Sequence, residues 1–168
     1  MSDKGQDYYD RLTDFMVEHV FPAEASYDAY REEKGPKDHT VPPVVEELKI
    51  EARKRGLWNL FLPSESGLTN LEYAPLAEIS GWSMEIAPEA INCAAPDTGN
   101  MEVLAKYGSP EQQQALLPDM LSGETLGAYA LSEPLAGSDI GAMTTRATAD
   151  GDDWRIRGRK AWISHAGH

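Results

Sequence analysis

Up to about residue 123, the apolar positions of the chain recur every three or four residues, the spacing of amphipathic helices. The first predicted helix ends near residue 21 or continues toward residue 30, and its apolar face carries Leu12, Phe15, Met16 and His19. A polar stretch over 34–40 contains Gly and Pro, which predicts a loop. The pattern therefore predicts an all-helical region at the start of the chain.

Local signals mark the ends of the next helices. Pro42-Pro43 begins one that turns Val45, Leu48 and Ala52 inward and ends at Gly56. The apolar connector over 57–63 is expected to be buried between helices. Thr69 and Glu72 have the spacing of a capping box, which predicts a helix through about residue 81.

Two more helices are predicted before residue 123. The first is short, covers 100–107 and ends at Gly108. Ser109 and Pro110 then give a strong start signal, an N-cap followed by a proline at the first helical position. That last helix ends at Gly123.

Beyond residue 123 the residues are small, β-branched or alternating, which favours strands. Asp150-Gly151 predicts a hairpin turn. After the turn, one strand face is apolar and the other cationic: Trp154, Ile156 and Gly158 alternate with Arg155, Arg157 and Arg159. Strands are expected on both sides of 129–139, about three in all. The predicted fold class is α+β, with an all-α domain over 1–123 followed by an incomplete antiparallel β domain over 124–168.

Composition narrows the possible partners. The net charge of −13 and the pI near 4.6 argue against nucleic acid or an anionic membrane as the main partner. No apolar stretch is long enough to span a membrane, and the polar start of the chain predicts no signal peptide. The single cysteine, Cys93, excludes an internal disulfide, is expected to be buried, and indicates a reducing, cytoplasmic location.

The most specific signal is the sequence YALSEPLAGSD over 129–139, followed by WIS over 162–164. Small side chains and glycine let backbone N–H groups approach a flat, hydrogen-bonding cofactor, and an aromatic side chain can pack on its ring. Each residue also has an ordinary interpretation. The serines can be loop hydroxyls, Gly137 can mark a turn, and Trp162 can be a core aromatic that closes a sheet.

These two segments, the second of them extended to GRKAWIS over 158–164, resemble the flavin-binding signature of the acyl-CoA dehydrogenases. The stretches GLWNLFLP over 56–63, APDTGNMEVL over 95–104 and YGSPEQ over 107–112 resemble the branch related to eukaryotic members fused to a phosphotransferase-like domain. The resemblance implies a helical N-terminal domain, a β domain and a C-terminal four-helix domain. It also implies FAD as cofactor and α,β-dehydrogenation of an acyl-CoA thioester, a step of fatty-acid β-oxidation.

The resemblance assigns roles to individual residues. Those lining the isoalloxazine or approaching FAD are Tyr129, Leu131, Ser132, Gly137, Ser138, Trp162, Ile163 and Ser164. Ser138 would also approach the acyl-CoA substrate, and Ser164 would place a hydroxyl near the flavin N5. One small departure is Leu135, which stands where many members have glycine.

The same resemblance places the catalytic base in the C-terminal domain, beyond His168, so no catalytic residue is expected in this chain. Glu133 belongs to the flavin-binding loop and is not the base. We therefore expect a truncated chain that is inactive alone. The complete enzyme would form a dimer or tetramer, bind an acyl-CoA and pass electrons to an electron-transfer flavoprotein.

Two other hypotheses remain open. The chain can be a non-catalytic partner-binding module or half-subunit that uses an exposed β edge as its interface, or a free-standing helical scaffold with a vestigial motif. The arginine row of the second strand is either a solvated face or a contact for an acidic partner or the CoA phosphates. The spacing of His19, His39, His165 and His168 does not predict a metal site.

Overall fold

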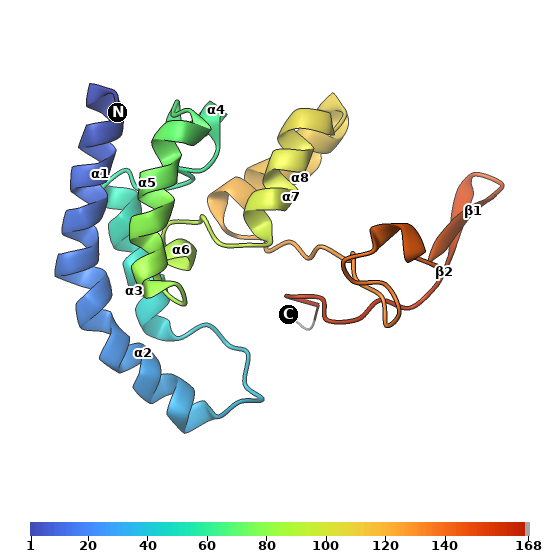
Figure 1. Ribbon diagram of the computed structural model, residues 1–168, viewed down its shortest axis with the longest axis horizontal. Helices are drawn as coiled ribbons and strands as arrows, with labels where there is room; N and C mark the ends of the chain where they lie inside the picture. Colours follow the sequence, from blue (N-terminus) through green and yellow to red (C-terminus); the bar gives the residue numbers. More distant parts are fainter. Residues whose placement is uncertain (167–168) are drawn as a thin grey trace. The chain divides into compact units, whose positions relative to one another are not determined.

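The computed structural model describes residues 1–166. It contains two compact units, a helical unit over 1–125 and a second unit, here called the β unit, that begins at Leu126. Figure 1 labels the elements of both units along the chain. The observed fold class is the predicted one, a helical N-terminal domain followed by an antiparallel sheet, which the structure describes with two strands.

The first helical segment extends beyond residue 21, the earlier of its two predicted ends. Helix α1 (Asp3–Phe15) passes through a π-helical turn (Met16–Val20) into α2 (Phe21–Lys34) without a break, as Figure 1 shows. An end near residue 21 was wrong. Pro22 lacks a backbone N–H, but it lies just after the π-helical turn, where the regular hydrogen-bond pattern is already interrupted, so it does not end the helix. His19 is only half-buried, so the core face of this turn is formed by Met16 and Val20.

The later predicted helices are confirmed. They are α3 (Pro43–Lys54), α5 (Asn70–Ser80), α7 (Asp97–Tyr107) and α8 (Pro110–Ser122). Helix α7 begins three residues before the predicted start at residue 100. The Thr69–Glu72 capping box is formed at α5, and Gly123 adopts the left-handed conformation that ends α8. Local signals were therefore sufficient to place these helix ends.

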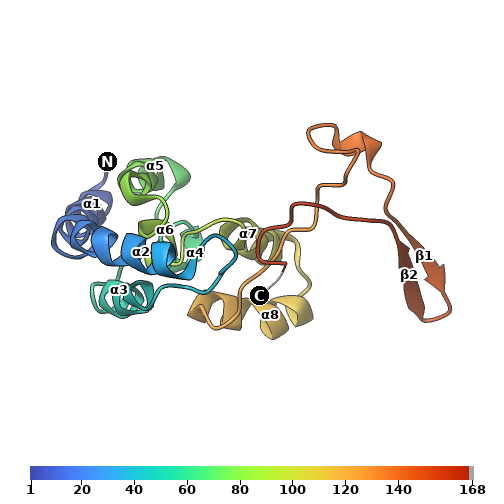
Figure 2. The ribbon, with the colours of Figure 1, turned by 90° about the horizontal axis from the view of Figure 1, so that it is seen from below.

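Two four-residue helices were not predicted, α4 (Pro63–Ser66) and α6 (Ala87–Ala90). Helix α6 contacts both α3 and α5, and Figure 2 shows it in the interior of the helical unit. Ala87, Ala90 and the following Ile91 are completely buried. A helix of four residues is too short to show a helical repeat, so it leaves no periodic pattern in the sequence.

The predicted burial of the connector over 57–63 is confirmed. Leu57 and Leu60 belong to the main core between α1, α3 and α5, while Phe61 and Leu62 pack with Met101 of α7 and Met120 of α8. The connector also holds the end of α8 by polar contacts. The side-chain amide of buried Asn59 donates to the Leu121 carbonyl at 2.9 Å, and Asn92 donates to the Asn59 side-chain oxygen at 2.6 Å.

The β unit contains the predicted hairpin. Strands β1 (Arg146–Asp150) and β2 (Asp153–Arg157) are antiparallel, and Gly151 in the turn has φ +67°. Ala147 pairs with Ile156 and Ala149 with Trp154 on one face, while arginines gather on the other. The two predicted faces are therefore confirmed, and both are exposed to solvent.

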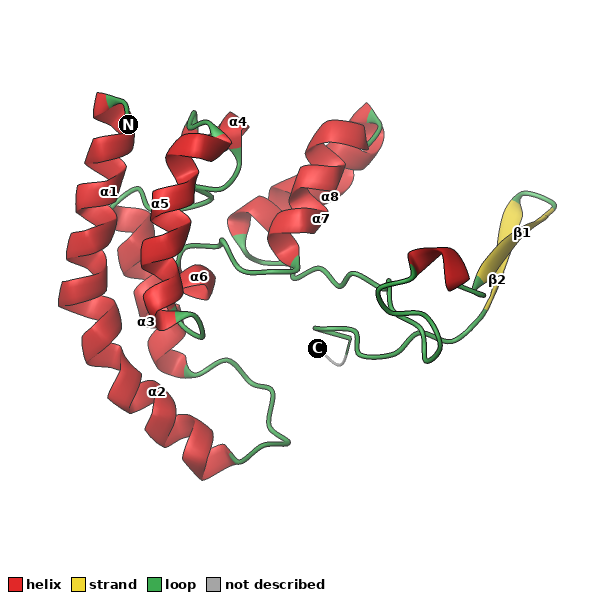
Figure 3. Ribbon diagram, viewed as in Figure 1, coloured by secondary structure: helices red, strands yellow, loops and turns green. Residues whose placement is uncertain are grey.

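A strand before the motif was also expected, and this expectation was wrong. Residues 126–132 form an extended loop, drawn in green in Figure 3, and within residues 1–166 the only pairing outside the hairpin is an isolated bridge between Glu133 and Ala136. The carbonyls of Leu131 and Ser132 instead bond to Lys160 and Ala161. Because these acceptors serve a side chain and a single N–H, no strand ladder forms.

Charge is divided unequally between the units. The residues from 126 onward contain five acidic and five basic side chains, so the whole net charge of −13 lies in the helical unit. The acidity inferred from composition is therefore a property of one unit only.

Candidate functional site

The centre of the β unit is a buried carboxylate, that of Glu133, which is 3% exposed. Its Oε2 accepts from the N–H of Thr144 at 2.7 Å and from the Thr144 hydroxyl at 2.9 Å. Its Oε1 accepts from the N–H of Thr145 at 2.9 Å and from the Lys160 ammonium at 3.0 Å. The carboxylate thus connects the motif loop to the start of β1 and to the segment after β2.

These donors also explain the acidity of Glu133. The nearby Thr145 hydroxyl, the N–H groups of Thr144 and Thr145 and the Lys160 ammonium hold the pKa of the Glu133 carboxyl well below its usual range, against the opposing effect of desolvation. The Thr145 hydroxyl is itself buried and has no partner within hydrogen-bond limits among the described residues. A carboxylate engaged in this way is a poor proton acceptor.

The segment after β2 lies against the motif loop. The Lys160 ammonium donates to the Leu131 carbonyl at 2.9 Å, and the N–H of the next residue, Ala161, donates to the Ser132 carbonyl at 3.0 Å. Residues 160 and 161 are therefore bonded to residues 131 and 132, a separation of 29 positions for the Lys160–Leu131 bond. The structure brings the two motif segments together at this point.

Trp162 follows directly and does not pack into a core. Its side chain is 82% exposed, and its backbone has φ +56°, in the left-handed region that few residues other than glycine adopt. The interpretation of Trp162 as a core aromatic is therefore wrong. Non-glycine residues held in this region cluster at functional sites.

The other predicted site residues lie at or near the surface of the β unit. Tyr129, Gly137, Ser138 and Ser164 are exposed, and Leu131, Ser132 and Ile163 are half-buried. The contacts of the described residues join 131–132 to 160–161. They record no bond between 137–138 and 162–164. His168 lies outside the described residues.

These residues fit the chemical demands of an isoalloxazine. Among the described residues, no protein acceptor is recorded for the N–H groups of Ser132, Gly137 and Ser138. A Cβ atom built on Gly137 meets no atom within 4 Å, so the space beside this backbone is open. Backbone donors with open space beside them, in a unit that also exposes an indole, suit a flat ring that has one polar edge.

Hollows open on the helical unit. One, of about 340 Å³, is lined by Phe61, Asn70, Tyr73, Cys93, Thr98 and Glu102. Burial raises the pKa of the Cys93 thiol to about 11. Burial, with Cys93 adding to the effect, also raises the pKa of Tyr73. Both groups stay protonated near neutral pH. Cys93 was expected to be buried, and the structure has it half-buried at the edge of the core.

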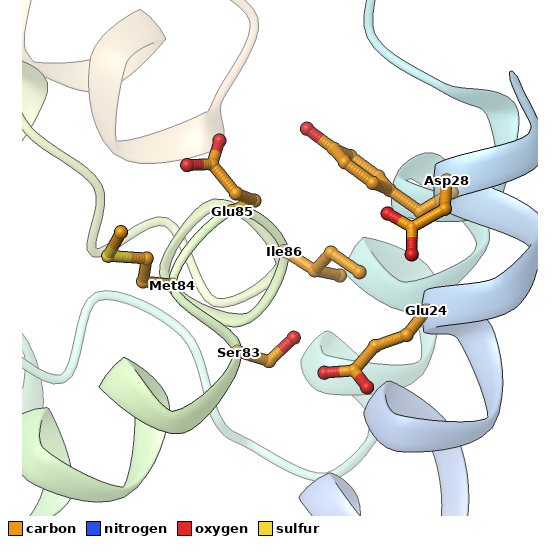
Figure 4. A pocket seen from close by; sticks show the side chains of 7 residues that line it. Glu24, Asp28, Ser83, Met84, Glu85 and Ile86 are labelled. Atoms are coloured by element: carbon orange, nitrogen blue, oxygen red, sulfur yellow. The ribbon is translucent and has the colours of Figure 1, made fainter. Parts of the chain in front are cut away.

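The second hollow, of about 240 Å³, lies between α2 and the segment before α6. Figure 4 shows the carboxylates of Glu24, Asp28 and Glu85 around it, with the Ser83 hydroxyl at one side. Within the described part of the chain, no group of His, Cys, Asp and Glu is arranged to hold a metal ion. No helix of that part combines the length and apolar character needed to cross a membrane.

Both units match models of known protein domains. The model of the N-terminal domain of acyl-CoA dehydrogenases matches residues 2–124, and the model of the middle domain matches 128–168. The chain belongs to the acyl-CoA dehydrogenase family. The resemblance inferred from the motif and the upstream stretches is therefore confirmed.

Individual relatives agree. Over 99% of its length, the chain is 59% identical to the acyl-CoA dehydrogenase FadE2 of Mycobacterium tuberculosis and 43% identical to acyl-CoA dehydrogenase family member 11 of Gallus gallus. The second match confirms the predicted relation to a eukaryotic branch. The chain spans 41% of the length of FadE2 and 22% of the length of the Gallus gallus protein.

Solved structures of this family share the fold. An acyl-CoA dehydrogenase structure from Mycobacterium abscessus has a TM-score of 0.90 and 40% identity, covering 99% of this chain and 44% of that one. Glutaryl-CoA dehydrogenase from Mycobacterium smegmatis, solved with FADH2, has a TM-score of 0.71 and 23% identity, covering 97% of this chain and 39% of that one. At that identity the second comparison concerns the fold alone.

The sequence analysis did not predict the structural roles of Lys160 and Glu133. No role was predicted for Lys160, and Glu133 was assigned to the flavin-binding loop without a structural role. The available signal was a charged residue of each sign inside otherwise small or apolar runs. Burial of such residues requires pairing, but the sequence does not reveal the partner.

Proposed function

We propose that this chain supplies the helical domain and part of the flavin-binding wall of an FAD-dependent acyl-CoA dehydrogenase. The whole protein would convert an acyl-CoA thioester to the 2-enoyl-CoA. The observation that carries the proposal is the junction of the two motif segments, in which Lys160 and Ala161 bond to the carbonyls of Leu131 and Ser132 within a family member. The resemblance of the two segments to the family's flavin-binding signature, within the part of the chain that the middle-domain model matches, supports the choice of cofactor.

The residues of the chain would bind and orient. Trp162 and Tyr129, both exposed, offer aromatic surface to the isoalloxazine, with Leu131 and Ile163 beside them. The hydroxyls of Ser132 and Ser164 and the free N–H groups at Gly137 and Ser138 offer hydrogen bonds to its polar edge, and Ser138 also to the substrate. When bound, FAD supplies the hydride acceptor, while the protein supplies orientation and electrostatics.

The proton-abstracting base is proposed to lie outside the described residues. Glu133 is the buried carboxylate of the motif, and its four donors stabilise the ionised form. Taking up a substrate proton would break these bonds and leave Lys160 without its countercharge. Glu133 is therefore better suited to hold the loop than to act as the base, and the 168-residue chain is proposed to be inactive alone.

The remaining functional expectations are also proposals. An electron-transfer flavoprotein would accept the electrons, the complete protein would be a homo-oligomer, and the domain division would fall near residue 123. The cytoplasmic location remains a prediction from cysteine usage.

Purification of the natural gene product that includes this chain tests the function. We expect visible flavin absorption that bleaches anaerobically on addition of an acyl-CoA, with 2-enoyl-CoA formed. Trp162→Ala should lower FAD affinity, whereas Trp154→Ala, which removes an exposed indole of the same unit, should not. A gene product that binds no flavin, or equal loss in both variants, would contradict the proposal.

The competing function is a partner-binding module. The observation in its favour is the exposed apolar hairpin face, where Trp154 is 68% and Ile156 70% exposed. A stable complex between this chain and a longer dehydrogenase chain, without bound flavin, would favour that hypothesis.

A further inference from the structure

An ion pair links the two motif segments. The Glu133 carboxylate and the Lys160 ammonium lie 3.0 Å apart. Glu133 directly follows Ser132, and Lys160 stands two residues before Trp162. The same ammonium donates to the Leu131 carbonyl at 2.9 Å. One side chain thus holds both the backbone and the carboxylate of the first segment.

The pair is shielded and its carboxylate is fixed from other directions. Glu133 is 3% exposed, and the side chain of Lys160 is 26% exposed. The backbone of Glu133 pairs with Ala136 in both directions, at 2.9 and 3.1 Å, and its side chain bonds to Thr144 and Thr145. Glu133 is therefore held in place within the β unit, and the Lys160 cation anchors the second segment to it.

Trp162 is held from both sides of its strained backbone. Before it, the Ala161 N–H bonds to the Ser132 carbonyl at 3.0 Å. After it, the ring Nδ1 of His165 bonds to the Gly127 carbonyl at 3.1 Å. A left-handed tryptophan costs conformational free energy, so it persists only where neighbouring bonds fix the chain. The indole is presented to solvent by these bonds and not by core packing.

We propose that Lys160 is a positioning residue: paired with Glu133, it fixes the Trp162 ring relative to the Ser132 hydroxyl, so that both form one preformed wall for the isoalloxazine. This inference rests on the proposed function. Preformed sites bind more tightly because ordering their side chains costs nothing at the moment of binding. In this proposal Lys160 acts through Trp162 and does not contact the isoalloxazine itself.

A purely structural role makes a different prediction. If the ion pair only stabilised the β unit, its loss would lower the stability of that unit and affect flavin binding in proportion. The 82% exposed Trp162 ring takes no part in core packing, so its environment reports position separately from stability. A change at Trp162 in a folded variant therefore distinguishes the two roles.

The test uses Lys160→Met in the natural gene product, because methionine keeps the aliphatic stem and removes the charge. Arg155→Met is the matched control, since Arg155 is an exposed cation of the same unit that pairs only with Asp150 in the described structure. The protein carries 5-fluorotryptophan, with the Trp162 resonance assigned through Trp162→Phe. The two readouts are the Trp162 fluorine signal without flavin and the dissociation constant for FAD.

We expect Lys160→Met to shift or broaden the Trp162 signal and to weaken FAD binding about tenfold, the size of one lost hydrogen bond to a charged group. Arg155→Met should change neither. Normal FAD binding and an unchanged Trp162 signal in Lys160→Met would overturn the positioning role and leave the proposed function intact. If the parent protein binds no FAD, the proposed function falls, and an unchanged Trp162 signal would then remove the positioning role as well.

If Lys160→Met does not fold, Glu133→Gln provides the second variant. Glutamine keeps the shape and an acceptor for Thr144 but removes the charge that attracts Lys160. The same two readouts apply. A shifted Trp162 signal with weakened FAD binding supports the proposal, and parent-like values for both overturn it.

Discussion

Gly158 lies against Thr145 so closely that a Cβ atom on Gly158 would sit 2.0 Å from the Thr145 hydroxyl oxygen and 2.6 Å from its Cα. Gly158 follows β2, and Thr145 precedes β1 and donates its N–H to Glu133. The open end of the hairpin is therefore packed directly on the residues that bind the buried carboxylate.

Gly158→Ala should destabilise the β unit, because the added methyl group meets backbone atoms that do not move freely. We expect the free energy of unfolding to fall by about 1–3 kcal/mol. Faster hydrogen exchange of the β-hairpin amides or a lower urea midpoint would measure this loss. Gly137→Ala is the control, since its Cβ would meet no atom within 4 Å. Equal stability of the two variants would contradict the packing argument.

Asn59 combines a buried amide with a left-handed backbone. It is 3% exposed, has φ +55°, and donates to Leu121 at the end of α8. Asn59→Ala should cost about 2–3 kcal/mol through the lost bonds and the strained backbone. Asn59→Gly removes the same amide but tolerates the backbone, so urea denaturation should show it less destabilised. The reverse order would contradict this account.

Glu72 makes the stability of the helical unit sensitive to acid. Bonds from the Ser2 hydroxyl, the Thr69 N–H and the Thr69 hydroxyl lower its pKa from 4.5 to about 2. A depressed carboxyl pKa contributes stability above the unfolded value, and this contribution is lost as the pH falls from 4.5 toward 2. The urea midpoint of the parent should therefore exceed that of Glu72→Gln at pH 7, with the gap closing near pH 2. A gap that does not change with pH would count against the assignment.

Cys93 should resist thiol reagents in the folded protein. Burial raises the pKa of its thiol to about 11, so little thiolate exists at mildly alkaline pH. Ellman's reagent should react about a hundredfold more slowly than with a small free thiol, and urea should restore the normal rate. Rapid labelling of the native protein would show that the hollow beside Tyr73 opens readily.

The parts that could be predicted from the sequence were those with local signals. The capping residues Thr69 and Ser109 placed two helix starts, and Asp150-Gly151 located the hairpin, although its two turn residues are Gly151 and Asp152. The extended loop over 126–132 was misjudged because strand formation depends on a partner and not on residue type alone. The bond between Lys160 and Glu133 spans 27 positions, and no local pattern encodes such a pairing.

The unequal division of charge makes ionic strength a selective probe of the two units. The helical unit carries all 13 surplus negative charges, so its like charges repel one another in dilute buffer, whereas the β unit is balanced. Added salt screens this repulsion. An unfolding transition that moves to higher temperature with salt would therefore belong to the helices, and one that stays in place would belong to the unit that carries Trp162.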